Sequence, residues 1–385
     1  MEFKLTEEQR MLKDSARALA AREIEPVLAA HDRDRPLPKA AMLRIFRALR
    51  ELGVLAPRIP ESAGGSGMSY LHYGLMMEEL PTPVCLAVMA HEVTATRIHL
   101  GADGEQRRRL LPPLLDGSRI ACSGISEPNV GSDPRAIETR ARPDGEFLVI
   151  DGTKLWITNG SVSDTIVAVA RLENGKQEQR QITRIVVERD VSPYAAREVE
   201  TIGLRQGHLS EVVFADCRVP RANLLGEPGD AHQSLTLTWL ANRPLVGLMA
   251  VGLAQRALDA SVAYAKLRVQ FGGPIGGRQL VQEMLSEMAT RIEASRLLCL
   301  RALSLLDDGV RSNKEASMAK AFATENCLTA LHLAMQVHGA SGLTRELGIE
   351  RMFRDARMLT IPDGTTQIQH LIVGRELTGL SAFAG

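Results

Sequence analysis

Hydrophobic and polar positions divide the chain into three stretches with different periodicities. Residues 1–118 repeat apolar positions at the three- and four-residue spacing of helices, as in "PKAAMLRIFRALREL", which begins at Pro38. Thr6 followed three residues later by Gln9 forms a capping box, which predicts a helix start. The glycines and serines of "PESAGGSG", residues 60–67, interrupt the pattern and predict a loop. We therefore predict an N-terminal α-helical domain over residues 1–118.

The second stretch, residues 119–226, has the residue pattern of β-strands. The segments "EFLVIDG", "TIVAVARL", "QITRIVVERD" and "EVVFADCRVP" are short runs rich in β-branched residues, separated by Gly, Asp and Asn. No helical segments alternate with these strands, which argues against a doubly wound parallel sheet. The spacing predicts a middle β domain over residues 119–226, built as an antiparallel sandwich or barrel.

Helical periodicity returns over residues 227–385. One apolar stripe is formed by Val281, Met284, Leu285, Met288 and Ile292. Breaks at "FGGPIGG", "DDGVRSN", "HGASGLTRELG" and "IPDG" separate four long helices. We predict a C-terminal four-helix bundle, and an α+β multidomain chain as a whole.

Composition narrows the class of protein. A chain of 385 residues favours two to three domains, and 45% hydrophobic with 24% charged residues is ordinary for a globular protein. Lys+Arg and Asp+Glu both number 46, so the net charge does not favour nucleic acid as a partner. No apolar run of about 18 residues and no signal peptide is evident, which predicts a cytoplasmic protein without a membrane span. The five cysteines lack paired spacing, which predicts buried, reduced thiols and no metal site.

Three motifs contain candidate chemistry: "CSGISEPNVGSD" at 122–133, "KLWITNG" at 154–160 and "IPDGTTQIQ" at 361–369. Each also has a purely structural explanation. The first is common turn chemistry, Trp156 could anchor a core, and Asp363 could cap a helix. None of the three is a Walker loop or a GxGxxG fingerprint.

Taken together, in this order and at these separations, the motifs resemble the acyl-CoA dehydrogenase family. The resemblance spans essentially the whole chain and includes "PESAGGSG", "RVQFGGPIGGRQLVQ" at 268–282 and "QVHGASGL" at 336–343. It implies a helix–β–helix architecture, FAD as cofactor, an acyl-CoA substrate and a homotetramer. It also implies an oxidoreductase acting on a CH–CH bond, with an electron-transferring flavoprotein as acceptor.

The resemblance assigns FAD-binding roles to individual residues. Contacts to the flavin ring are expected from the backbone of Ile125 and Ser126, from Trp156 beside the ring, and from Thr158 near flavin N5. The adenine half is expected to contact Arg268, Gln270, Phe271, Arg278 and Gln279. Gln336 and Gly339 are expected to reach FAD on a neighbouring subunit. Thr365 and Gln367 are expected at the pyrophosphate, where a helix N-terminus independently favours an anion.

The resemblance also identifies Asp363 as the catalytic base that removes the α-proton, while flavin N5 accepts the β-hydride. Most family members have glutamate at this position. An apolar turn makes a carboxylate a better general base through desolvation. Aspartate is one methylene shorter, so its carboxylate falls about an ångström short, and a shift of ~1 Å can cost ~10²-fold in rate. We therefore expect a cyclic or branched acyl group. The structural alternative for Asp363 is a helix N-cap bonded to the amide of Thr365 or Thr366.

Further departures concern the substrate. The implied substrate contacts are Ser132 at the CoA arm, Arg243, Gly364, His91 and Glu92. His91 and Glu92 either form a hydrogen-bonded helix face or a polar floor of the acyl pocket. Asn242 stands at the second base position of the family and cannot serve as a base. Leu240 replaces an acidic residue near the CoA arm, so an acyl-carrier-protein thioester is an alternative substrate. A flavin monooxygenase and a non-catalytic flavoprotein are the alternative functions.

Overall fold

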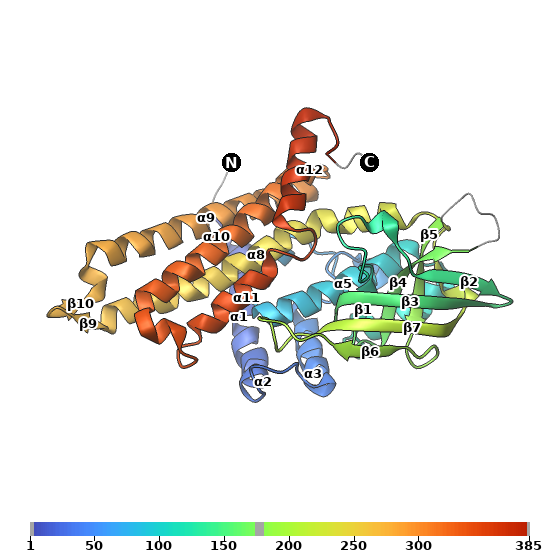
Figure 1. The fold of residues 1–385 in the computed structure, drawn as a ribbon, viewed down its shortest axis with the longest axis horizontal. Helices are drawn as coiled ribbons and strands as arrows, with labels where there is room; N and C mark the ends of the chain where they lie inside the picture. The colour runs from blue at the N-terminus through green and yellow to red at the C-terminus, as the bar shows by residue number, and fades with distance from the viewer. Residues whose placement is uncertain (1–3, 174–180, 383–385) are drawn as a thin grey trace.

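The computed structural model describes residues 4–173 and 181–382, and Figure 1 shows their arrangement. A helical N-terminal part is followed by a β-sheet and then by a bundle of long helices, as predicted. The sheet lies at one end of the elongated molecule, and the small hairpin of β9 and β10 lies at the far tip of the bundle. The α+β, three-part architecture predicted from the sequence is therefore confirmed.

Seven α-helices precede the sheet within the described residues from position 4 onward. They are α1 (Glu7–Leu19), α2 (Glu25–Ala29), α3 (Lys39–Leu49), α4 (Tyr70–Glu79), α5 (Thr82–Gly101), α6 (Gly104–Leu110) and α7 (Pro112–Leu115). The predicted capping box is present, because the side chains of Thr6 and Gln9 each accept a hydrogen bond from the other's backbone N–H. Helix α5 has 20 residues and is buried along most of its length. Figure 1 shows it between the sheet and the bundle.

In the part of the chain that the structure describes, the sheet has eight strands. They are β1 (Ala121–Gly124), β2 (Arg140–Asp144), β3 (Phe147–Thr158), β4 (Thr165–Leu172), β5 (Gln181–Glu188), β6 (Ala195–Glu198), β7 (Leu209–Pro220) and β8 (Leu224–Leu225). Their order is β6-β7-β3-β2-β4-β5-β8, with β1 added on β4. Most pairs are antiparallel, but β1–β4 and β2–β4 are parallel. This differs from the expected purely antiparallel sheet, because long connections let β1 and β2 lie beside β4 in the same direction.

The C-terminal part contains α8 (Ala231–Leu267), β9 (Val269–Gln270), β10 (Gly273–Pro274), α9 (Gln279–Asp307), α10 (Asn313–His338), α11 (Ile349–Leu359) and α12 (Thr366–Thr378). Three helices are long, whereas α11 and α12 have 11 and 13 residues. The expected set of four long helices is thus three long helices and two short ones. The segment Leu235–Leu267 is long and apolar enough to cross a membrane, but 72% of its most apolar window is buried inside the protein. It is a central helix of the bundle, which is apolar on all sides.

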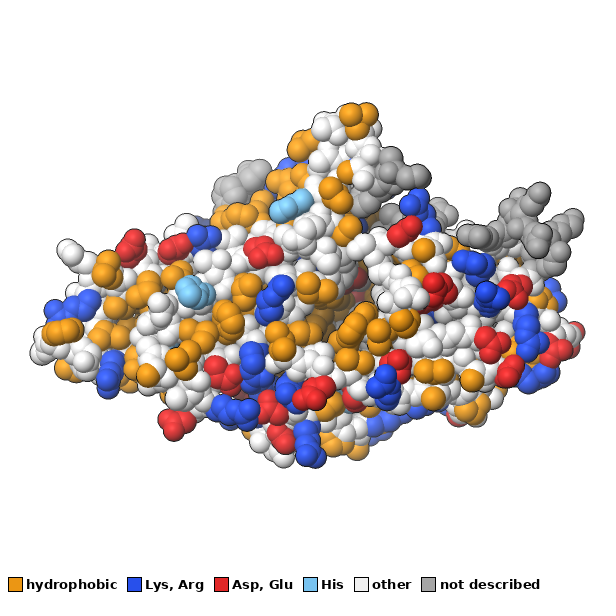
Figure 2. Space-filling view, viewed as in Figure 1, with side chains coloured by type: hydrophobic (Ala, Val, Ile, Leu, Met, Phe, Trp, Pro, Cys, Tyr) orange, Lys and Arg blue, Asp and Glu red, His pale blue; other side chains and the backbone are white. Residues whose placement is uncertain are grey.

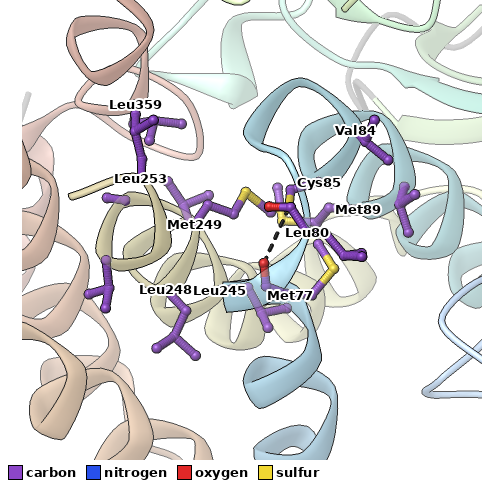
Figure 3. Close-up of a cluster of buried hydrophobic side chains, with 14 of the residues drawn as sticks. Met77, Leu80, Val84, Cys85, Met89, Leu245, Leu248, Met249, Leu253 and Leu359 are labelled. Atoms are coloured by element: carbon purple, nitrogen blue, oxygen red, sulfur yellow. Dashed lines mark hydrogen bonds between the residues drawn. The ribbon is translucent and has the colours of Figure 1, made fainter. Parts of the chain in front are cut away.

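One continuous core joins the N-terminal helices to the bundle. Figure 3 shows Met77 and Leu80 at the end of α4, with Met89 of α5, packed against Met249 of α8. The Sγ of Cys85 donates a hydrogen bond to the carbonyl of Met77 at 3.2 Å. All five cysteines are free and buried, as predicted. This packing fixes α5 against α8, which sets the frame of the site described next.

The surface in Figure 2 carries acidic and basic groups mixed together. This face is hollowed in its middle, below α12 and between the helical bundle and the sheet. The hollow lies near the turn that joins α11 to α12, which contains Asp363.

Candidate active site

The turn between α11 and α12 presents the Asp363 carboxylate. Asp363 has a φ of 52°, a left-handed conformation that Asp tolerates better than most residues. Thr365, not Asp363, is the N-cap of α12, and its hydroxyl accepts a hydrogen bond from the N–H of Ile368 at 3.4 Å. Within residues 4–173 and 181–382, the half-buried carboxylate of Asp363 has no hydrogen bond and no ion pair. The helix-cap alternative therefore does not apply to Asp363.

Two side chains hold the backbone of this turn. The Nζ of Lys320, from α10, donates to the carbonyls of Thr360 and Gly364, both at 2.8 Å. The Nε2 of Gln369, from α12, donates to the carbonyls of Asp363 and Gly364, both at 3.0 Å. A Cβ on Gly364, whose φ is +94°, would lie 2.6 Å from that Nε2. Glycine is therefore required next to Asp363, and the carboxylate projects from a fixed turn.

Three buried cations surround this carboxylate. Burial lowers the pKa of Arg97 and of Arg243 to about 10 each, and the pKa of Lys320 to about 8. In all three groups the negative charge of Asp363 opposes the effect of burial. Arg243 donates instead to neutral partners, the Oδ1 of Asn313 at 2.7 Å and the Oγ of Ser317 at 3.3 Å. The region thus favours negative charge without an ion pair that would occupy Asp363.

A β-bulge displays Trp156. Between Lys154 and Ile157, strand β3 advances three residues while β7 advances only two. Trp156 takes a φ of 66° and its side chain is 54% exposed. The alternative that Trp156 anchors the core is therefore wrong. Bulges often redirect side chains next to active sites, and a large residue in this strained conformation indicates a functional position.

The loop after β1 lies against this bulge. The N–H of Leu155 donates to the carbonyl of Ser126 at 2.9 Å, and the Nζ of Lys154 donates to the carbonyl of Ile125 at 3.3 Å. The structure thus brings Ile125 and Ser126 next to Trp156. Thr158 is half-buried at the end of β3.

A buried ion pair fixes that loop. The carboxylate of Glu127 accepts a hydrogen bond from the Nζ of Lys154 at 2.6 Å and from the N–H of Thr139 at 2.9 Å. Burial raises the pKa of Glu127, but the charge of Lys154 and these hydrogen bonds lower it further, so the net shift is downward. Burial lowers the pKa of Lys154 to about 8. Ser132, expected at the CoA arm, lies exposed beyond this anchored loop.

Helix α5 connects the sheet side to the Asp363 side. The hydroxyl of Thr94 lies 2.8 Å from that of Ser123 on β1. One turn later on α5, Arg97 lies in the field of Asp363. Helix α5 therefore links the two halves of the site.

The remaining predicted cofactor residues lie elsewhere on the chain. Those around the β9–β10 hairpin and at the end of α10 are all exposed: Arg268, Gln270, Phe271, Arg278, Gln279, Gln336 and Gly339. Figure 1 shows the hairpin at the far tip of the bundle, away from β3. Phe271 is 94% exposed and has a φ of 51°. Within one chain, these exposed residues therefore do not lie next to Trp156 and residues 125–126, which are predicted to contact the flavin ring.

The two candidate pocket residues on α5 have different environments. The Nε2 of His91 lies 3.0 Å from the carbonyl of Leu114, and its Nδ1 accepts from the N–H of Ala121 at 3.0 Å. Both ring nitrogens are thus occupied by backbone, which favours the hydrogen-bonded alternative for His91. Burial lowers the pKa of His91 to about 4, so the ring is neutral. Glu92 is fully buried and pairs with Arg58 at 2.5 Å.

Family models match along most of the chain. The acyl-CoA dehydrogenase N-terminal domain matches residues 6–118, the middle domain residues 122–217 and the C-terminal domain residues 235–378. The chain belongs to the acyl-CoA dehydrogenase family. It is therefore a member of a family of FAD-dependent oxidoreductases that act on CH–CH bonds.

Curated relatives match over nearly full length. A probable acyl-CoA dehydrogenase, YngJ, of Bacillus subtilis is 36% identical over 98% of this chain and 100% of its own. The benzylmalonyl-CoA dehydrogenase of Aromatoleum aromaticum is 37% identical over 98% and 100%. Among solved structures, a glutaryl-coenzyme A dehydrogenase with glutaryl-CoA has a TM-score of 0.91 at 29% identity, covering 98% of this chain and 97% of that one. The prolyl acyl carrier protein oxidase AnaB has a TM-score of 0.88 at 25% identity, covering 97% and 100%.

The residues of this acyl-CoA dehydrogenase family member fit FAD at two places on one chain. The first backbone N–H groups of α12, at Thr366 and Gln367, have no acceptor within their own helix and suit a pyrophosphate. The bulge presents the Trp156 ring beside backbone groups of the 125–127 loop. Sequence reasoning missed the supporting charges Arg58, Arg97, Lys154 and Lys320. For Arg97, Lys154 and Lys320 the signal was a basic residue within an apolar helix or strand, as in "ASMAKAFAT". Arg58 lies in a loop and has no such signal.

Proposed function

We propose that the protein removes the α- and β-hydrogens of an acyl-CoA thioester, with Asp363 as the base. The observation that supports this most is the Asp363 carboxylate itself, which is half-buried, has no partner among the described residues, and projects from a left-handed turn held by Lys320 and Gln369. A carboxylate with no hydrogen bond or ion pair has its oxygens free to accept a proton. FAD, when bound, supplies the acceptor for the β-hydride.

The turn offers a second group for the reaction. The backbone N–H of Asp363 makes no hydrogen bond in the part of the chain that the structure describes. It can donate to the thioester oxygen, on which negative charge grows as the α-proton leaves. The surrounding cations Arg97, Arg243 and Lys320 stabilise that charge through space. The shorter reach of Asp363 compared with glutamate supports a cyclic or branched acyl group.

A complete FAD site needs a second copy of the chain. The exposed group at the bundle tip, including Arg268, Phe271 and Gln336, is separated from Trp156 along the length of the molecule. We propose that these residues hold the adenine half of FAD bound to another subunit of a homotetramer. An electron-transferring flavoprotein is the proposed electron acceptor.

Acyl carrier protein is a second candidate, besides CoA, for the thiol that carries the acyl group. The similarity to a prolyl acyl carrier protein oxidase favours an acyl-carrier-protein thioester as the alternative. Leu240, where many relatives carry an acidic residue, is buried with 6% exposure. The acyl groups named for the relatives include glutaryl and benzylmalonyl, so their names do not select one acyl group.

The test is the isosteric substitution Asp363→Asn. The variant should bind FAD like the wild type and lose turnover by about 10²- to 10⁴-fold, the range for a lost general base. Turnover is measured as anaerobic bleaching of the flavin by a panel of acyl-CoA and acyl-carrier-protein thioesters. Asp308→Asn, at an exposed helix end, is the matched control and should be unaffected.

Two outcomes would contradict the proposal. Full activity of Asp363→Asn would remove Asp363 from the role of base. Rapid hydroxylation or oxidation by O₂ after reduction, with no bleaching by thioesters, would favour a flavin monooxygenase.

A further inference from the structure

A buried polar cluster lies behind the Asp363 turn, between α5 and α8. The "arginine cluster" consists of Arg58, Glu92, Arg97, Thr238 and Asn242. The Nη2 of Arg58 donates to the Oε1 of Glu92 at 2.5 Å and to the Oδ1 of Asn242 at 2.6 Å. Arg97 donates from Nε and Nη2 to the Oγ1 of Thr238, at 3.2 and 2.8 Å. These five residues come from α5, α8 and the loop before α4, so the cluster is built by the tertiary fold.

The charges in this cluster do not balance. Arg58 and Arg97 carry two positive charges, and Glu92 is the one carboxylate among the five residues. Glu92 forms its ion pair with Arg58, whose side chain is 5% exposed. Arg97 is 2% exposed, and within the described ranges it makes no ion pair. Among the described residues, two further atoms lack an acceptor: the buried Nε of Arg58 and the Nη1 of Arg97.

An unpaired buried guanidinium is costly, because several kcal/mol of hydration are lost without a compensating anion. Burial accordingly lowers the pKa of Arg97 to about 10. Asp363 acts on Arg97 only through space and is not its ion-pair partner. Direct pairing would make Asp363 a weaker base. Arg97 thus carries a charge with which an external anion can pair while Asp363 keeps its function.

We infer that the acyl group of the substrate carries a second carboxylate, at the end remote from the thioester, which binds Arg97 within the arginine cluster. The inference rests on the proposed function, since it places this acyl end beyond Asp363. A carboxylate matches the planar fork of a guanidinium through two parallel hydrogen bonds. The Glu92–Arg58 pair keeps the second guanidinium in place.

The test compares acyl-CoA thioesters of equal length that differ only at the remote end. The pairs are glutaryl- with pentanoyl-CoA, adipyl- with hexanoyl-CoA and pimelyl- with heptanoyl-CoA. For one or more pairs, the carboxylated thioester should bleach the flavin with a kcat/KM on the order of 100-fold or more above its alkyl counterpart. A site built around a charged partner discriminates strongly against a ligand that lacks it.

Variants of Arg97 test whether this residue causes the preference for carboxylated thioesters. Arg97→Met should remove the preference, measured as the ratio of the two kcat/KM values within each pair, whereas the loss of its through-space charge should slow both members of a pair alike. It should fold because an unpaired buried charge is replaced by an apolar chain. Arg97→Lys should keep part of the preference, since the charge remains but the fork is lost. Arg256→Met is the control, because Arg256 also donates to a threonine hydroxyl, that of Thr82 at 3.1 Å, outside the cluster.

Binding can be read without turnover. In the Asp363→Asn background, calorimetric titration should show tighter binding of the carboxylated thioester, and Arg97→Met should abolish that difference. If alkyl thioesters bleach and bind as well as or better than carboxylated ones, the inference fails while the proposed function stands. If Arg97→Met leaves a carboxylate preference intact, Arg97 is not the binding group. If no thioester bleaches the flavin, the proposed function itself fails.

Discussion

Lys320 provides a quantitative test of how the Asp363 turn works. Its Nζ is fully buried and donates at 2.8 Å to the carbonyls of Thr360 and Gly364, on either side of Asp363. The substitution Lys320→Met keeps most of the side-chain length and removes the charge and both hydrogen bonds. The expected effects on stability and on catalysis differ, and they can be separated by pH.

The effect on stability at pH 7 should be small. Lowering the pKa of Lys320 from the ordinary 10.5 to about 8 corresponds to a burial cost of roughly 3 kcal/mol, at about 1.4 kcal/mol for each pH unit. The two hydrogen bonds to a charged donor contribute about 1.5–3 kcal/mol each. The variant loses the bonds and also loses the burial cost, so a net destabilisation of about 0–3 kcal/mol is expected.

The pH dependence of stability should differ between the two proteins. Between pH 8 and 10.5, folded wild-type protein has released the Lys320 proton, whereas the unfolded chain still holds it. The unfolded state then binds more protons, so the free energy of unfolding of the wild type rises relative to the variant as the pH rises through this window. The gain approaches roughly 3 kcal/mol near pH 10.5 and is absent below pH 8.

The substitution Lys320→Met should have a larger effect on kcat than on the free energy of unfolding. Without Lys320, only Gln369 holds the carbonyls of Asp363 and Gly364. A displacement of the carboxylate by ~1 Å would reduce kcat by up to ~10²-fold with little change in KM. Urea unfolding at pH 7 and pH 10, with rapid-mixing measurement of flavin bleaching, tests both effects. Lys314→Met, on the same helix but 38% exposed, is the control. Wild-type kcat in Lys320→Met, together with an unfolding difference that does not change with pH, would refute the reasoning.

Two further substitutions test neighbouring parts of the site. Asp363→Glu should fold with a small loss of stability, because glutamate tolerates the φ of 52° less well than aspartate, and should turn over more slowly; an unchanged rate in the bleaching assay would remove the argument from side-chain length. Glu127→Gln leaves the charge of Lys154 buried without a counter-charge, so urea unfolding should show a loss of about 3–5 kcal/mol together with weaker FAD binding. The double variant Glu127→Leu/Lys154→Met should recover most of that stability, and no recovery would show that the pair matters for something other than charge balance.

Local patterns in the sequence were sufficient for the order and type of the elements. Helical periodicity, the Thr6–Gln9 capping box and the β-branched runs depend on residues close in the chain, so their physics can be evaluated without the fold. The sequence also identified the candidate base Asp363, through three motifs whose spacing resembles one family. Which residues touch FAD or substrate remains a prediction.

Only the tertiary structure decided how these residues are presented. The bulge that exposes Trp156 depends on the register of β3 against β7, and the parallel β1–β4 pair joins segments distant in the chain. The bracing of Asp363 by Lys320 and the surplus charge of Arg97 likewise arise where separate helices meet. Such features cannot be predicted from a local pattern, because burial, strain and charge balance are properties of the packed chain and depend on neighbours that only folding supplies.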